Sequence, residues 1–175
     1  MIRSAPTANH WRVCIAVIGP GEEATTDAVR DAEDAGRHIA RRGWITLCGG
    51  RAVGVMEAAA RGASEEKGLV VGVLPGADKS EAASSLTIAL PTGLGEARNA
   101  VLVGSADAVI ACGINPGTAS EIALSLKARK PIALIGPTSE TAGFFASLKG
   151  GDAVYVAADA KDAIHWIATA MGRTL

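Results

Sequence analysis

The sequence RVCIAVIGPG, residues 12–21, decides the fold class. An uninterrupted apolar run leads into a Gly-Pro-Gly turn, and Ala28, Ala32, Ala35 and Ile39 then recur at helical spacing. Continuous apolar strands, without the alternation of a half-exposed strand, are typical of a parallel sheet covered on both faces. The stretch therefore predicts a buried strand, a turn and a crossover helix.

The same alternation continues along the chain. Strands are expected at residues 12–18, 44–48, 69–74, 86–90, 108–112, 131–135 and 153–156. Helices are expected at residues 25–42, 52–67, 94–105, 118–129, 139–149 and 159–171. This order predicts an α/β, Rossmann-like three-layer fold with a central, mostly parallel sheet of about six to seven strands.

Composition narrows the possible classes. The 175 residues suit a single domain, expected at residues 11–175 after a polar tail at residues 1–10. A net charge of −1 without a basic run argues against nucleic-acid binding. No apolar run approaches the roughly 20 residues of a membrane span, and no signal core is visible, so we expect a cytoplasmic protein.

Cysteine and histidine usage suggests neither disulfides nor a metal site. Cys14, Cys48 and Cys112 are odd in number, lack a CxxC spacing and lie in or beside apolar runs, which is typical of buried thiols in a reducing compartment. The three histidines show no metal-ligand spacing, so no metal site is expected.

Glycines gather where three predicted strands end. They are Gly19 and Gly21, Gly49 and Gly50, and Gly113 and Gly117. In an open parallel sheet these ends share one edge, where helix N-termini present N–H groups to anions. We therefore favour a phosphate or anion site over glycines that serve turn geometry alone.

Two common nucleotide motifs are missing. The first strand is not followed by GxGxxG and no acidic residue closes the second strand, which disfavours NAD. The chain also lacks GxxxxGK[ST], so a P-loop NTPase is not expected.

Three polar residues have two interpretations each. Thr118 and Glu121 have the spacing of a helix capping box, which is the favoured interpretation, but Thr118 could instead bind phosphate and Glu121 could act in acid–base chemistry. Arg98 stands in an otherwise apolar helical segment, where it either extends to solvent or clamps a phosphate or carboxylate.

Taken together, several segments resemble the LOG-like superfamily, often labelled lysine decarboxylases, over roughly residues 12–170. The segments are Gly49–Met56, Ala60–Ala63, Val71–Pro75, Ala97–Asn99 and Gly117–Glu121. The resemblance implies one of two activities. One branch consists of nucleoside 5′-monophosphate phosphoribohydrolases, in which Arg98 and Glu121 would be catalytic. The other consists of molybdenum cofactor carriers, which bind, protect and pass on the cofactor.

The chain looks closer to the carriers. Where the hydrolases have PGGxGT, it has Gly113-Ile114-Asn115-Pro116-Gly117-Thr118, so the glycine pair is lost and Pro116 lacks an N–H. The resemblance thus implies a non-catalytic carrier of molybdenum cofactor, with the hydrolase as the alternative. The lysines, such as Lys67, Lys79 and Lys127, do not suggest a pyridoxal phosphate enzyme such as lysine decarboxylase.

The carrier hypothesis also implies a set of cofactor-binding residues and partners. The residues are Gly19, Gly21, Gly49, Gly50, Arg51, Arg98, Asn99, Gly113, Asn115, Gly117, Thr118 and Glu121. The resemblance implies a homodimer or homotetramer, with recipient molybdoenzymes as further partners.

Overall fold

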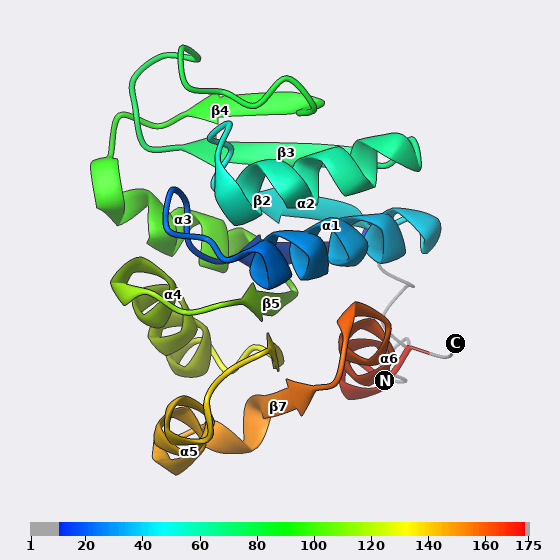
Figure 1. The fold of residues 1–175 in the computed structure, drawn as a ribbon, viewed down its shortest axis with the longest axis vertical. Helices are drawn as coiled ribbons and strands as arrows, with labels where there is room; N and C mark the ends of the chain where they lie inside the picture. Colours follow the sequence, from blue (N-terminus) through cyan, green and yellow to red (C-terminus); the bar gives the residue numbers. More distant parts are fainter. Residues whose placement is uncertain (1–10, 174–175) are drawn as a thin grey trace, which may run out of the picture.

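All seven strands of the sheet run parallel, in the order β4-β3-β2-β1-β5-β6-β7 (Figure 1). The computed structural model describes residues 11–173, so the predicted tail at residues 1–10 lies outside the described residues. The strands are β1 Cys14–Ile18, β2 Ile45–Cys48, β3 Leu69–Leu74, β4 Ile88–Pro91, β5 Ala108–Cys112, β6 Ile132–Ile135 and β7 Val154–Ala157. The predicted α/β Rossmann-like fold is confirmed.

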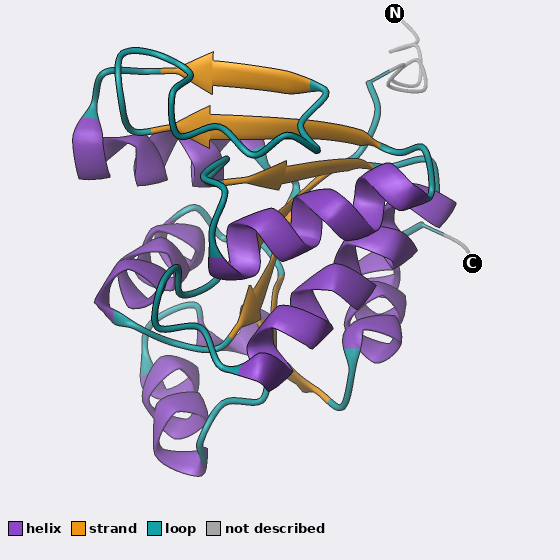
Figure 2. Ribbon diagram, turned by 45° about the horizontal axis from the view of Figure 1, so that its top comes forward, coloured by secondary structure: helices purple, strands orange, loops and turns teal. Residues whose placement is uncertain are grey.

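Helices cover both faces of the sheet, as Figure 2 shows. One face carries α1 Thr26–Arg41, α2 Gly54–Glu65 and α6 Ala160–Ala170. The other carries α3 Arg98–Ser105, α4 Pro116–Lys127 and α5 Ser139–Ser147. Short 3₁₀ turns, η1 Gly95–Ala97 and η2 Gly151–Ala153, precede α3 and β7.

Strand β1 shows how the apolar run serves both layers. Ile15 and Val17 pack with α1, α2 and α6, whereas Ala16 and Ile18 pack with the helices of the opposite face. All four side chains are at most 2% exposed. Because both faces of the strand are buried, every position is apolar, as the continuous run predicted.

Helices α1 and α2 approach each other through glycines. A Cβ on Gly36 would lie 2.2 Å from the carbonyl oxygen of Ala59, and one on Gly62 would lie 2.0 Å from that of Glu33. The two backbones are therefore close enough that no side chain fits between them at these positions.

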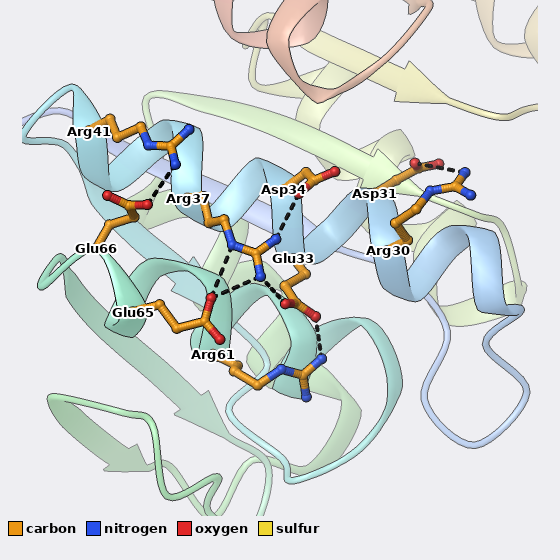
Figure 3. Close-up of polar contacts among 9 residues, drawn as sticks. All are labelled: Arg30, Asp31, Glu33, Asp34, Arg37, Arg41, Arg61, Glu65 and Glu66. Atoms are coloured by element: carbon orange, nitrogen blue, oxygen red, sulfur yellow. Dashed lines mark hydrogen bonds and ion pairs between the residues drawn. The ribbon is translucent and has the colours of Figure 1, made fainter.

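Ion pairs join the same two helices along their solvent side (Figure 3). The Arg37 guanidinium lies 2.8 Å from a Glu65 oxygen and also pairs with Glu33. Arg41 pairs with Glu66 at 2.6 Å. These arginines of α1 therefore link it to α2.

Several element boundaries differ from the sequence-based expectation. The fourth strand spans Ile88–Pro91 instead of residues 86–90, because it is an edge strand whose extent is set by pairing with β3. The helix expected at residues 94–105 is divided: Gly95 has a φ of +54°, and α3 proper begins only at Arg98. Within residues 11–173, no helix is both long and apolar enough to cross a membrane.

Candidate functional site

A cavity of about 140 Å³ lies where the strand order reverses. The chain builds outward from β1 to β4 and then returns to place β5 on the other side of β1. The loops that leave two such neighbouring strands diverge to opposite faces and leave a crevice at their carboxyl ends, the usual ligand position in open α/β sheets. The cavity is lined by the loops after β1 and β2 and by the first turns of α3 and α4.

Most of the predicted binding residues meet at this cavity. Ten of the twelve line it: Gly19, Gly21, Gly49, Arg51, Arg98, Asn99, Asn115, Gly117, Thr118 and Glu121. The other two, Gly50 and Gly113, do not line it but have φ values of +78° and +77° in the adjoining turns. Their positive φ values indicate that these two glycines serve turn geometry, which was the alternative interpretation of the glycine positions.

The predicted capping box at Thr118 and Glu121 is wrong. Helix α4 begins earlier, with Pro116 at its first position and Asn115 as its N-cap. The Asn115 Oδ1 accepts hydrogen bonds from both the N–H and the hydroxyl of Thr118, each at 2.9 Å. Asn is as good an N-cap as Thr, and proline is favoured at the first helical position. The helix therefore begins at Pro116, with Asn115 as its cap.

This start has a consequence for ligand binding. The N–H of Thr118 is already bonded to Asn115, and Pro116 has no N–H to offer. Among the described residues, the N–H of Gly117 finds no acceptor, and Gly117 lines the cavity. The positive end of the α4 dipole and this one N–H therefore face the cavity together.

Arg98 is the first residue of α3 and is almost completely buried, with 8% of its surface exposed. Within the described residues, neither its Nε nor its Nη1 has a hydrogen-bond partner. The guanidinium lies against Gly49, where an added Cβ would stand 2.4 Å from Nη1. A buried cation with unused donors is costly, which indicates a group shaped for an incoming anion.

Glu121 lies on the second turn of α4 and is 6% exposed. Burial raises the pKa of its carboxyl from 4.5 to about 7, an effect that the Arg98 cation opposes and the Glu96 carboxylate reinforces. At neutral pH the group is therefore divided between its acid and its carboxylate. Such a carboxyl can donate a hydrogen bond, accept one or transfer a proton.

The rim of the cavity is held together by Arg51. Its guanidinium pairs with Glu22 at 3.0 Å and with Glu81 at 3.4 Å, while its backbone forms a β-bridge to Ala82. These contacts join the loops that follow β1, β2 and β3. Arg51 therefore reaches the cavity as a residue already paired, unlike Arg98.

Three further side chains that line the cavity were not among the predicted site residues: Glu22, Met56 and Glu96. Glu22 directly follows Gly21, one of the glycines at a predicted strand end, and Glu96 directly precedes the Ala97–Asn99 segment, so both positions carried a usable signal. The Met56 side chain lies close to Gly49, since an added Cβ on Gly49 would be 2.4 Å from the Met56 sulfur, and no spacing in the sequence reveals this proximity.

The model of one family, SLOG cluster4, matches residues 12–164. The chain belongs to the SLOG cluster4 family. This SLOG cluster4 chain is similar to the solved molybdenum cofactor binding protein of Rippkaea orientalis, at 41% identity and a TM-score of 0.90, covering 93% of this chain and 99% of that one. It is also similar to the molybdenum cofactor carrier protein of Chlamydomonas reinhardtii, at 41% identity and a TM-score of 0.87, covering 93% and 100%.

A third relative of the SLOG cluster4 chain is an uncharacterized protein of Archaeoglobus fulgidus. The two are 42% identical over 123 residues, which is 70% of this chain and 80% of the relative. The predicted resemblance is confirmed, because the family model matches the chain and its solved neighbours are named as molybdenum cofactor binding and carrier proteins.

The raised pKa of Glu121 predicts how the stability of this SLOG cluster4 protein depends on pH. The folded state holds the Glu121 proton more tightly than the unfolded state does, so the contribution of Glu121 to stability is complete below pH 4.5 and is lost as pH rises through about 7. We expect the Glu121→Gln variant to escape this loss and to exceed the wild type by up to about 3 kcal/mol at pH 8. Urea unfolding at pH 5 and pH 8 measures the difference.

Glu23→Gln is the control, because it makes the same chemical change at an exposed position. It should give no such gain at pH 8. A Glu121→Gln variant whose advantage over the wild type is equal at both pH values would show that the Glu121 carboxyl is not held protonated by burial.

Proposed function

We propose that the protein binds molybdenum cofactor, protects it and passes it to molybdoenzymes. The observation that supports this most is the buried Arg98 guanidinium at a cavity lined by glycine turns, since two of its nitrogens have no partner among the described residues. The phosphate and the molybdenum oxo groups of the cofactor are anionic. The Arg98 cation, the N–H of Gly117 and the α4 dipole are the chemistry that such an anion requires.

The size of the cavity indicates which part of the ligand it takes. Its volume of about 140 Å³ is below the range of about 300–1,000 Å³ for pockets that enclose a whole ligand. We therefore place the phosphate end of the cofactor in the cavity, beside Arg98 and Gly117. The remainder would extend along the rim formed by Glu22, Arg51 and Glu81.

The binding test uses cofactor freshly released from a molybdoenzyme. After anaerobic mixing and gel filtration, molybdenum and the oxidised pterin should co-elute with the protein, and the cofactor should lose activity more slowly in air. Transfer is then measured as activity regained by a cofactor-free molybdoenzyme. Failure to retain molybdenum would refute the proposal. Retention without transfer would show that the protein stores the cofactor and does not pass it on.

A phosphoribohydrolase is the second candidate, and the Glu121 carboxyl favours it. A pKa of about 7, raised by burial, suits a group that exchanges a proton at neutral pH, and Arg98 would hold the phosphate of a nucleoside monophosphate. Incubation with adenosine and cytokinin monophosphates should then release free base, and Glu121→Gln should abolish the release. No free base at high protein concentration would eliminate this candidate.

Self-association is part of the proposal, as a homodimer or homotetramer. On the face that α3 and α4 cover, the register pairs Val71 with Ile88 and Val73 with Leu90. Ile88 and Leu90 nevertheless remain 50% and 47% exposed. A second copy packed over this open end of the sheet would bury them. Light scattering after gel filtration gives the mass, and Leu90→Glu should lower it.

The cytosol is the compartment that we propose. Burial raises the pKa values of Cys48 and Cys112, and the three cysteines are free thiols. Free thiols of this kind persist in a reducing compartment.

A further inference from the structure

A second, larger cavity lies at the opposite end of α4. Its volume is about 680 Å³, and it is bounded by the last turn of α4 and by the segment that joins α5 to β7. We call it the basic groove; its walls carry Leu126, Lys127, Arg129, Leu148, Lys149 and Asp152. Helix α4 begins at the first cavity, and its last turn borders the basic groove.

The basic groove combines positive charge with an apolar surface. Lys127, Arg129 and Lys149 face one carboxylate, Asp152, and none of the four takes part in an ion pair within residues 11–173. Leu148 contributes an apolar side chain that is 37% exposed. On α1, by contrast, Arg30, Arg37 and Arg41 are each paired with carboxylates.

The walls of the groove are held in place by backbone contacts. Arg129 follows α4 with a φ of +55°, a conformation that glycine usually takes at a helix end. The next residue, Lys130, donates from Nζ to the carbonyls of Val103 and Gly104 at 2.7 and 2.8 Å, which anchors this turn to α3. On the opposite wall Gly150 lies so close that an added Cβ would be 3.3 Å from the Leu126 oxygen.

From these features we propose that the basic groove is a second ligand site, for a small organic anion with an apolar body and a phosphate, sulfonate or carboxylate group. The volume falls within the range of about 300–1,000 Å³ for small-molecule sites. The apolar body would lie on the exposed Leu148, and the acidic group would bind among the three cations. This site is independent of the cofactor site, because the two share no lining residue.

Two fluorescent dyes that differ only in charge provide the test. Anilinonaphthalene sulfonate and phenylnaphthylamine have the same aromatic body, and only the first carries a sulfonate. We expect the sulfonate to bind the wild type at one site per chain, at least about tenfold more tightly than the neutral dye. Equal affinities for the two dyes would overturn the proposal.

Variants then locate the bound dye. Lys127→Ala, Arg129→Asn and Lys149→Ala combined should weaken sulfonate binding by about tenfold or more, and Asn tolerates the φ of position 129. Lys161→Ala, which removes an exposed cation on α6, is the matched control and should leave binding unchanged. Equal weakening by the control, or none by the triple variant, would contradict the proposal.

Competition separates a free small molecule from an acidic segment of another protein. Naphthyl phosphate, which has the proposed ligand chemistry, should displace the sulfonate dye at lower concentration than a soluble Leu-Glu peptide does. The reverse order would assign the groove to a protein partner and overturn the small-molecule site. Hydrogen exchange should slow at residues 123–129 and 148–153 on dye binding, and the triple variant should lose this protection.

Discussion

Replacing Arg98 with methionine is expected to weaken cofactor binding by about 100-fold or more, while the ligand-free protein stays equally stable or becomes more stable. Two charge-assisted hydrogen bonds are lost, at about 1.5–3 kcal/mol each, and about 1.4 kcal/mol corresponds to tenfold in affinity. Within residues 11–173, the Nε and Nη1 donors have no partner in the ligand-free protein, so removing them relieves a desolvation penalty. Binding is measured by molybdenum retention and stability by urea unfolding.

Both measurements belong at pH 6, below the raised pKa of Glu121, where its carboxyl is mostly protonated and does not depend on the Arg98 cation. Arg61→Met is the matched control, since Arg61 is a partly exposed arginine paired with Glu33, and it should retain full binding. An Arg98→Met protein that binds within threefold of wild type would exclude Arg98 as the anion ligand.

Gly49→Ala tests the same contact without removing the cation. Its Cβ would stand 2.4 Å from both the Arg98 Nη1 and the Met56 sulfur, so these flexible side chains must move. We expect a partial loss of cofactor binding, about tenfold, with a smaller effect on folding than a clash with backbone would have. Binding as tight as that of the wild type would show that the position of the guanidinium against Gly49 does not matter.

Gly62→Ala is expected to destabilise the fold by about 3 kcal/mol, a fall in Tm of roughly 6–12 °C for a chain of this length. The new Cβ would lie 2.0 Å from the carbonyl oxygen of Glu33 and 2.8 Å from its carbonyl carbon. Both atoms belong to the backbone of α1, which cannot rotate aside as a side chain can. Relief therefore requires α1 and α2 to separate, with loss of their packing and ion pairs.

Gly104→Ala makes the same substitution in a helix where it should be harmless. Nothing lies within 4 Å of the position a Cβ would take on Gly104, so the change should stabilise α3 by up to about 1 kcal/mol. Calorimetric melting of both variants beside the wild type compares them directly. If the Gly62→Ala protein has the same melting temperature as the Gly104→Ala protein, α1 and α2 can move apart without loss of stability.

The fold was predictable because local patterns and burial agree. Leu69–Leu74 and Ala108–Cys112 were expected as strands with the bounds that the structure has. Both are apolar runs flanked by residues that are disfavoured in strands, which are Gly68 and Pro75 for the first and Asp107 and Gly113 for the second. The glycines of the turns then located the ligand edge, because parallel strands end at one edge. Most of the cavity followed from that rule together with the family resemblance.

What could not be predicted depended on competition between near-equal local choices. Asn115 and Thr118 are both good N-caps, and only the folded chain shows that Asn115 caps α4 and occupies the N–H of Thr118. The burial of Arg98 and Glu121, which gives the site its chemistry, depends on loops that come from distant parts of the chain. The burial of these two side chains results from tertiary packing, which residue spacing does not encode.

The return of the chain from β4 to β5 has a consequence for how the protein unfolds. Gly19 and Gly49 come from the first half of the sheet, and Arg98 and Gly117 follow only after β4, so the cavity exists only when both halves are assembled. A cofactor bound there would contact segments that are distant in sequence, and its binding would stabilise the whole folded state by mass action. Amide protons in β1, β2 and β5 should then exchange more slowly together, as one cooperative unit.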